Sequence, residues 1–177
     1  MSLGQFKGKF GQGIRPNLYT VTGNFGGVIL APEEALLIKA AAMPSASLGV
    51  VTVPFKGREV KRAGDRTFTD WTISVLCDDQ NAIHEKFIEW SSTFYSLNEI
   101  NRGTAYGSWT VAPLDVGGGG STNTSVGIPA ELPAGKVIRL VDCWPSEVGT
   151  IDFSYDSTDA VAEFSVTIGF DHWEFVD

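Results

Sequence analysis

The stretch Phe164-Ser165-Val166-Thr167-Ile168-Gly169-Phe170-Asp171 decides the fold class. Its apolar residues occupy every second position, and Ser, Thr, Gly and Asp fill the positions between them. Successive side chains of a β-strand point to opposite faces of a sheet, so this pattern predicts a long strand with one buried face. The same alternation recurs along most of the chain and predicts a mainly β protein.

The other expected strands are spread over the whole sequence. Trp71, Ile73 and Val75 alternate with polar residues, and Ile138 and Leu140 flank Arg139 in the same way. Shorter strands are expected at residues 18–22, 36–42, 50–55, 58–62, 106–112 and 150–155. Glycine and proline predict turns between them at Pro44, Pro54 to Gly57, Gly64, Gly103, Pro145 and Gly149.

One segment has the spacing of a helix and not of a strand. Its large apolar residues are separated by four, three and four positions, which places them on one helical stripe: Ile83, Phe87, Trp90 and Phe94. Asp78 and Asp79 precede this stripe, where a carboxylate accepts hydrogen bonds from the free N–H groups of a first turn. One amphipathic helix over about residues 80–95 should therefore pack on the sheet.

Length and composition limit the possible functions. The 177 residues fit a single domain spanning residues 1–177, and 43% apolar against 19% charged residues excludes a disordered chain. No apolar run has the length of a membrane helix or of a signal peptide. The net charge of −8 argues against a dedicated nucleic-acid binder, which needs Lys and Arg to displace counterions from phosphates.

A long glycine-rich loop is expected at about residues 113–135. It contains four consecutive glycines, Gly117 to Gly120, followed by a run of Ser, Thr and Asn. Such a segment buries too little surface to offset its backbone entropy, so we expect it to be flexible or ordered only by a neighbour. The glycine run lacks the Gly-Lys-Ser or Gly-Lys-Thr ending of a phosphate-binding loop.

The residues that most often carry catalysis or bind metals are few. His84 and His172 are the only histidines, and no Gly-x-Ser-x-Gly turn accompanies them, so no catalytic triad is expected. Cys77 and Cys143 lie in strand-like runs and are expected to be reduced packing residues, with a disulfide as the alternative. We expect no enzyme, no cofactor and no metal site.

Two further groups of residues have a functional and a structural interpretation. Asp152, Asp156 and Asp159 lack the spacing of a calcium loop and are expected to form a solvated turn. Five tryptophans are compatible with a carbohydrate-binding surface: Trp71, Trp90, Trp109, Trp144 and Trp173. The first two lie on predicted core faces, whereas the sequence does not decide for the other three.

Seven stretches, in order, resemble the tail tube proteins of the T-even-type contractile bacteriophages. The most specific is Gly64-Asp65-Arg66-Thr67-Phe68, within residues 63–71. The others are residues 15–19, 39–44, 86–90, 98–100, 144–149 and 173–174. The sequence departs from the family pattern in the loop at 23–32 and in the long insertion at 113–135.

The resemblance implies a fold, an assembly and partners. The fold would be a small antiparallel β-barrel or sandwich with one flanking helix. Six copies would form a ring, and rings would stack into the inner tube of a contractile tail, assembled in the host cytoplasm around a tape-measure protein. The other partners would be the tail sheath, baseplate and tail terminator proteins, and viral DNA would pass through the lumen without specific binding.

The resemblance also suggests which residues join the rings. Residues 50–62 form two expected strands around Phe55-Lys56-Gly57, and with a following loop at 63–66 they would make the hairpin that reaches the next ring. The candidate stacking residues are Phe55, Lys56, Gly57, Arg58, Asp65 and Arg66. Asp65 and Arg66 are the candidates for ion pairs between subunits.

Two alternatives remain open from the sequence. The chain could be the tube protein of a bacterial injection or type VI secretion machine, which conducts effector proteins. From a different class, a monomeric β-sandwich that binds carbohydrate would show the same strand pattern and exposed tryptophans.

Overall fold

The computed structural model describes residues 2–11, 13–95, 102–114, 136–156 and 160–176. The helices are α1 (Leu3–Phe10), α2 (Pro32–Ala35), α3 (Ala82–Thr93) and α4 (Arg102–Ala105). The strands are β1 (Tyr19–Phe25), β2 (Val28–Ile29), β3 (Ile38–Ala41), β4 (Ala46–Phe55), β5 (Arg58–Phe68), β6 (Trp71–Leu76), β7 (Gly107–Pro113), β8 (Val137–Val148), β9 (Glu163–Gly169) and β10 (His172–Val176).

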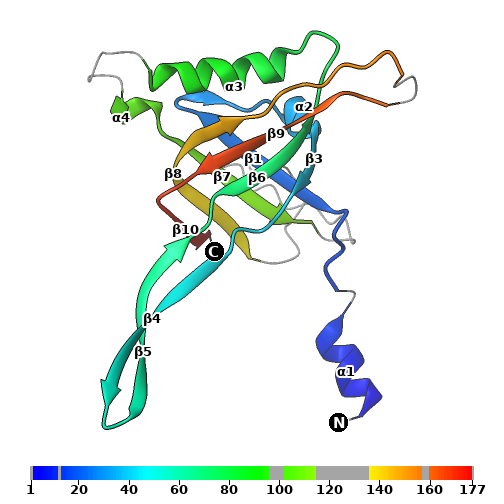
Figure 1. The fold of residues 1–177 in the computed structure, drawn as a ribbon. Helices are drawn as coiled ribbons and strands as arrows, with labels where there is room; N and C mark the ends of the chain where they lie inside the picture. The colour runs from blue at the N-terminus through cyan, green and yellow to red at the C-terminus, as the bar shows by residue number, and fades with distance from the viewer. Residues whose placement is uncertain (1, 12, 96–101, 115–135, 157–159, 177) are drawn as a thin grey trace.

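The main sheet is antiparallel and folds back on itself (Figure 1). Its strands follow the order β2-β1-β7-β8-β9-β6-β3, and β10 pairs with β8. Strands far apart in this order nevertheless meet: the rings of Trp109 in β7 and Trp71 in β6 are 6.0 Å apart. The Tyr19 hydroxyl in β1 donates to the Ile38 carbonyl in β3 at 2.8 Å. The expected mainly β, antiparallel fold is confirmed, although the pairing order is open and ends at β2 and β3.

Strand β8 joins the two layers of the sheet. Its first half pairs with β7 and β10, and its second half, from Trp144 onward, pairs with β9. The register shifts at the change of partner, where Asp142 has a positive φ of 53°. Asp tolerates this left-handed conformation better than most side chains, so the strand can bend there.

Helix α3 covers the upper edge of the sheet and completes the core (Figure 1). Ile83, Phe87 and Trp90 are all buried, as the spacing predicted. The Phe25 ring of β1 meets Phe87 edge-on at 4.9 Å. Asp78 Oδ2 accepts a hydrogen bond from the Ala82 amide at 3.2 Å, so an expected acidic residue does hold the first turn.

Eight of the nine predicted strands are present, and one is wrong. Residues 150–155 form no strand, although Ile151, Phe153 and Tyr155 alternate with polar residues. The pairing of β8 with β9 ends just before them, where the Gly149 amide donates to Ser165 at 2.7 Å. No strand of the described residues pairs with this segment, and Phe153 and Tyr155 are exposed.

Several predicted turns lie within regular elements. Gly64 is inside β5 and Pro145 is inside β8, each next to a shift of register, and Gly103 is in α4. Glycine and proline are tolerated in strands at such bulges, which explains why they did not mark strand ends.

Three helices were not predicted, so the expectation of one helix was too low. Helix α1 begins with a capping box in which Ser2 Oγ accepts from the Gln5 amide and the Gln5 side chain accepts from Ser2. Helix α2 begins at Pro32, and Glu34 accepts from the Ala31 amide at 3.0 Å. Both sequences therefore carry start signals of a helix. The glycine-rich loop at 113–135 lies outside the described residues from 115 onward.

Cys143 should be unreactive in the folded protein. Its side chain is buried, and burial raises the pKa of the Cys143 thiol from the ordinary 9.0 to about 12. The reactive thiolate is therefore absent at pH 8. In a Cys77→Ser variant we expect no labelling by a thiol reagent until urea unfolds the chain.

The raised pKa of Cys143 also determines the direction in which the stability of the fold changes with pH. The folded state binds the Cys143 proton more tightly than the unfolded state, so this group stabilises the fold below pH 9.0, and that stability is lost as the pH rises toward about 12. Rapid labelling of native Cys77→Ser protein at pH 8 would contradict the burial of Cys143. Both cysteines are free thiols in the structure, as expected.

Candidate assembly surfaces

Strands β4 and β5 form a hairpin that projects from the body (Figure 1). Phe55 pairs with Arg58, and the two residues of the turn, Lys56 and Gly57, have φ angles of 46° and 78°. Positive φ at both positions is typical of the two-residue hairpin turn whose twist matches that of the paired strands. All ten residues of β4 are exposed, so this hairpin is not held by the core.

The two faces of the hairpin differ in polarity. Directly paired residues share a face, and Val51 with Arg62, Val53 with Val60 and Phe55 with Arg58 lie on one face. On the other face, the two pairs nearer the tip each contain a charged residue, Thr52 with Lys61 and Pro54 with Glu59, whereas Val50 with Ala63 is apolar. Four large apolar side chains between arginines thus lie in solvent on one face. We call Val51, Val53, Phe55, Val60 and the flanking Arg58 and Arg62 the hairpin apolar face. Apolar side chains gathered on a projecting element mark a surface for a protein partner.

The expected loop at residues 63–66 is wrong, because these residues belong to β5. The register shifts between Leu48 and Val50, so Gly64 and Asp65 lie opposite Gly49 in a bulge. A bulge increases the local twist of a hairpin without ending it. Asp65 is therefore near the base of the hairpin and not at its tip.

Arg66 is engaged within the chain. Its guanidinium lies 5.1 Å from the centre of the Phe68 ring and 5.0 Å from that of Trp173 in β10. These contacts join the base of the hairpin to the body of the protein. Of the six candidate stacking residues, Phe55 to Arg58 surround the tip, whereas Asp65 and Arg66 lie near the base.

Replacing Arg66 tests this role at the hairpin base. Arg66→Ala should lower the free energy of unfolding by about 1 kcal/mol, because both cation–π contacts are lost. Asp65→Ala is the matched control and should change it by less than about 0.5 kcal/mol. Urea unfolding measures both, and equal effects of the two variants would contradict the assignment to Arg66.

Helix α1 is a second projection on the same side of the body (Figure 1). None of its residues is buried, and the stacked rings of Phe6 and Phe10 are 5.5 Å apart. Lys7 and Lys9 add positive charge to its last turn. This surface was not predicted from the sequence, although two signals indicate it. They are the Ser2 to Gln5 capping box and the three-residue and four-residue spacing of Leu3, Phe6 and Phe10.

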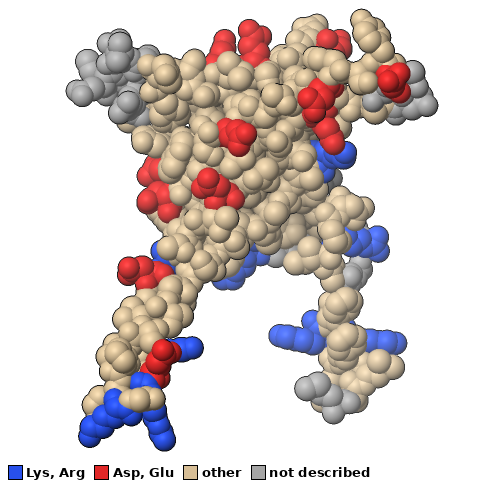
Figure 2. Space-filling model, viewed as in Figure 1, with Lys and Arg blue, Asp and Glu red and all other residues tan. Residues whose placement is uncertain are grey.

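Charge is divided between the two projections and the body. Residues 2–15 and 46–68 contain eight of the 13 Lys and Arg residues, but only two of the 21 Asp and Glu residues. Figure 2 shows blue side chains on both projections and red side chains over the upper body. Positive and negative charges are thus separated in space, with basic projections below an acidic body.

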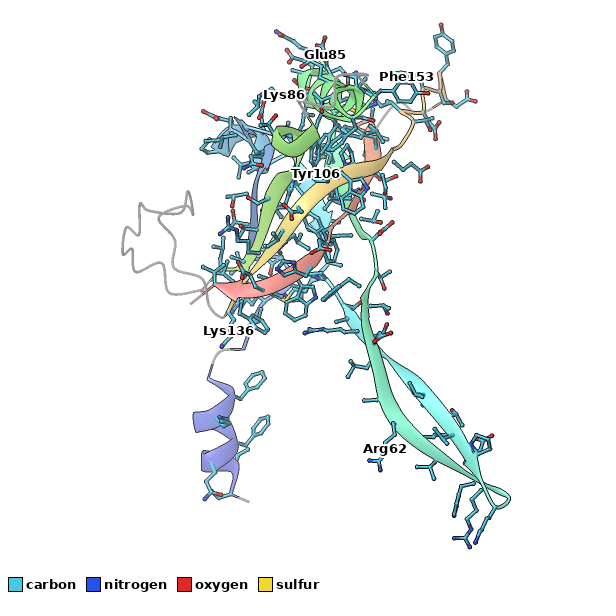
Figure 3. The ribbon with its side chains drawn as sticks, turned by 90° about the vertical axis from the view of Figure 1, so that its left-hand side faces the viewer. Arg62, Glu85, Lys86, Tyr106, Lys136 and Phe153 are labelled. Carbon is cyan, nitrogen blue, oxygen red and sulfur yellow. The ribbon has the colours of Figure 1, made fainter. Side chains whose placement is uncertain are left out.

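The acidic end also carries exposed aromatic residues. Phe153 lies beside α3 at the end of the molecule that carries Glu85 (Figure 3), and 86% of its surface is exposed. Tyr155 is exposed as well. In the same view Arg62, on the hairpin, is at the opposite end.

The histidines occupy separate positions. His84 packs edge-on against the Phe164 ring with centroids 4.8 Å apart, and the exposed His172 lies 3.0 Å from Asp171. Among the described residues, no three His, Cys, Asp or Glu side chains are grouped to hold a metal ion. No helix in the described part of the chain combines the length and apolarity of a membrane span. Asp159 of the expected acidic turn lies outside the described residues.

The structure resolves the position of each tryptophan. Trp71, Trp90 and Trp109 are buried in the core. Trp144 meets the Tyr106 ring edge-on at 6.1 Å, and Trp173 packs on Arg66. Core packing thus accounts for three of the five tryptophans that suggested a carbohydrate surface.

Comparison with known proteins identifies the family. A family model described as phage tail tube protein matches residues 15–176. The chain belongs to this family. It is 27% identical to the tail tube protein gp19 of Enterobacteria phage T6 and 26% identical to that of phage T4, with 93% of each chain covered in both cases. The resemblance to the T-even-type proteins is therefore confirmed.

Solved structures share the fold of this family member. A chain in the extended sheath-tube complex of an extracellular contractile injection system, PVC, has a TM-score of 0.60 and 12% identity, with 99% of each chain covered. Another chain, in the extended sheath/tube terminator of the same system, has a TM-score of 0.62 and 14% identity, covering 93% of this chain and 96% of its own. At these identities the likeness concerns the fold alone.

Proposed function

We propose that the protein is the protomer of a phage inner tail tube. The hairpin apolar face carries this proposal, because Val51, Val53 and Phe55 are exposed on an element that only a neighbouring molecule can cover. Membership of the tail tube protein family supplies the kind of assembly. The chain would act as one domain in the virion, with a structural and not an enzymatic role.

The finer arrangement follows the family resemblance. Six copies close into a ring, and rings stack into a hollow tube. The tube assembles around a tape-measure protein in the host cytoplasm. A contractile sheath surrounds the tube, and baseplate and terminator proteins lie at its two ends. The relatives in phages T4 and T6 favour a phage tail over a bacterial injection machine.

The hairpin is the contact between rings in this proposal. Phe55, Lys56, Gly57 and Arg58 at its tip reach the next ring, together with Val51 and Val53. Arg66 instead fixes the base of the hairpin through Phe68 and Trp173. Asp65, in the bulge, remains the candidate for an ion pair with a neighbouring subunit.

The excess of acidic residues suits the passage of DNA. The chain has 21 Asp and Glu residues against 13 Lys and Arg, and most of the basic ones lie on the two projections. When the projections are covered by neighbours, the remaining surface repels phosphates. Viral DNA then slides through the lumen without specific binding.

Sedimentation of the purified chain at increasing concentration tests the proposal. A tube protomer should pass from monomers to species of at least six copies as the concentration rises. A monomeric carbohydrate-binding module would sediment at 19.0 kDa at every concentration. Monomers throughout, also after addition of a preformed tail baseplate, would contradict the proposed function.

A further inference from the structure

We propose that α1 is a latch that binds the outer face of α3 on the next copy of this chain. The inference rests on the proposed function, because it assigns an occupant to α1 within a head-to-tail assembly. It adds a second contact between copies, separate from the hairpin.

Helix α1 presents a stripe suited to a helical partner. Leu3, Phe6, Lys7 and Phe10 follow the spacing of one helix face, and 59% of each phenylalanine surface is exposed. This helix contains two lysines and no acidic residue. Its partner should therefore be acidic and should offer some apolar area.

The outer face of α3 has the complementary stripe. Glu85, Ile88, Glu89 and Ser92 have the same spacing and lie opposite the buried residues of the helix. Ile88 is 46% exposed between the two glutamates. The neighbouring segment adds exposed Phe153 (Figure 3), together with Asp152 and Asp156.

The negative charge of this face is not neutralised by the lysine of the same helix. Lys86 forms its ion pair with Glu34 of α2, away from Glu85 and Glu89. Figure 3 shows Lys86 and Phe153 on opposite sides of α3, with Glu85 outermost. The face is thus free to attract the lysines of α1.

The arrangement of the two surfaces favours a second copy as the occupant. Helix α1 and α3 lie at opposite ends of the protein (Figure 1), so α1 of one copy faces α3 of another when molecules associate head to tail. In the sequence, eight residues, 11–18, separate α1 from β1, and eight extended residues reach at most about 26–29 Å. This reach lets α1 cross to the neighbouring copy.

Charge exchange between the two helices tests the latch. Lys7→Glu with Lys9→Glu should raise the critical concentration for tube growth at least about tenfold, and so should Glu85→Lys with Glu89→Lys. The variant with all four changes has the net charge of the natural chain. Its critical concentration for tube growth should lie within about threefold of that of the natural chain. Failure of this folded variant to recover would overturn the latch.

Crosslinking identifies the occupant directly. In a Cys77→Ser, Cys143→Ala background that folds by circular dichroism, copies with Phe10→Cys are mixed with copies carrying Ile88→Cys. We expect disulfide-linked pairs containing one copy of each kind, and none when Leu36→Cys, an exposed position on the body, replaces Ile88→Cys.

The outcomes separate the latch from the proposed function. Tubes that form without this crosslink, or with α1 linked to a sheath protein, would overturn the latch and leave the tube proposal standing. A natural chain that never assembles would overturn both.

Discussion

Val53→Asp with Phe55→Asp should abolish tube formation and leave the protomer folded. Both side chains lie on the hairpin apolar face, where about half or more of each is exposed. Val53 lies opposite Val60, so a carboxylate introduced at position 53 would be buried against a neighbour without a cation across from it, at a cost of several kcal/mol. Phe55→Asp removes the largest apolar side chain of the same face. Sedimentation should show monomers, while circular dichroism and the urea midpoint stay close to those of the natural chain.

Thr52→Asp is the matched control for this prediction. Thr52 lies on the same strand between the two changed residues, but its side chain shares the opposite hairpin face with Lys61. The new carboxylate has a cation beside it, so assembly should persist. Equal loss of assembly in Thr52→Asp would contradict the assignment of the contact to the apolar face.

Trp90→Ala should have the largest effect on the stability of the protomer. Trp90 is buried, its indole N–H donates to the Ala105 carbonyl at 2.8 Å, and its ring stacks on Trp109 at 6.2 Å. Removal of a buried aromatic side chain leaves a cavity and costs about 3–5 kcal/mol. Urea unfolding followed by circular dichroism measures the loss.

Two further variants separate the causes of that loss. Trp90→Phe keeps a ring but leaves the Ala105 carbonyl without its donor, so about 1–3 kcal/mol should be lost. Trp144→Ala changes a partly exposed tryptophan and should cost less than Trp90→Ala. The position of Trp90 at the centre of the core would be wrong if both alanine variants lost the same free energy.

The sequence predicted those elements whose residues face a single core. In β6, β9 and α3 the apolar spacing matches the buried residues, because each element lies flat on the core and its period is visible in the sequence. The pattern failed at residues 150–155, where Phe153 and Tyr155 alternate but no core lies beneath them. Periodicity shows that a face is apolar, and only the fold shows whether that face is covered.

The assembly surfaces were only partly predictable, because they too depend on contacts that the local spacing of residues does not show. The hairpin turn at Lys56-Gly57 carries a local signal and was expected. The contact of Arg66 with Trp173 joins residues distant in sequence, and the acidic face of α3 opposite α1 depends on the whole fold. Local spacing contains no information on either arrangement.

Electron microscopy of the purified chain at high concentration tests the central claim most directly. Images of negatively stained protein should show rings with a central hole and tubes of stacked rings, and Val53→Asp with Phe55→Asp should show neither. Particles that remain single compact protomers at every concentration, with or without a baseplate, would contradict the account of this protein as a tube protomer.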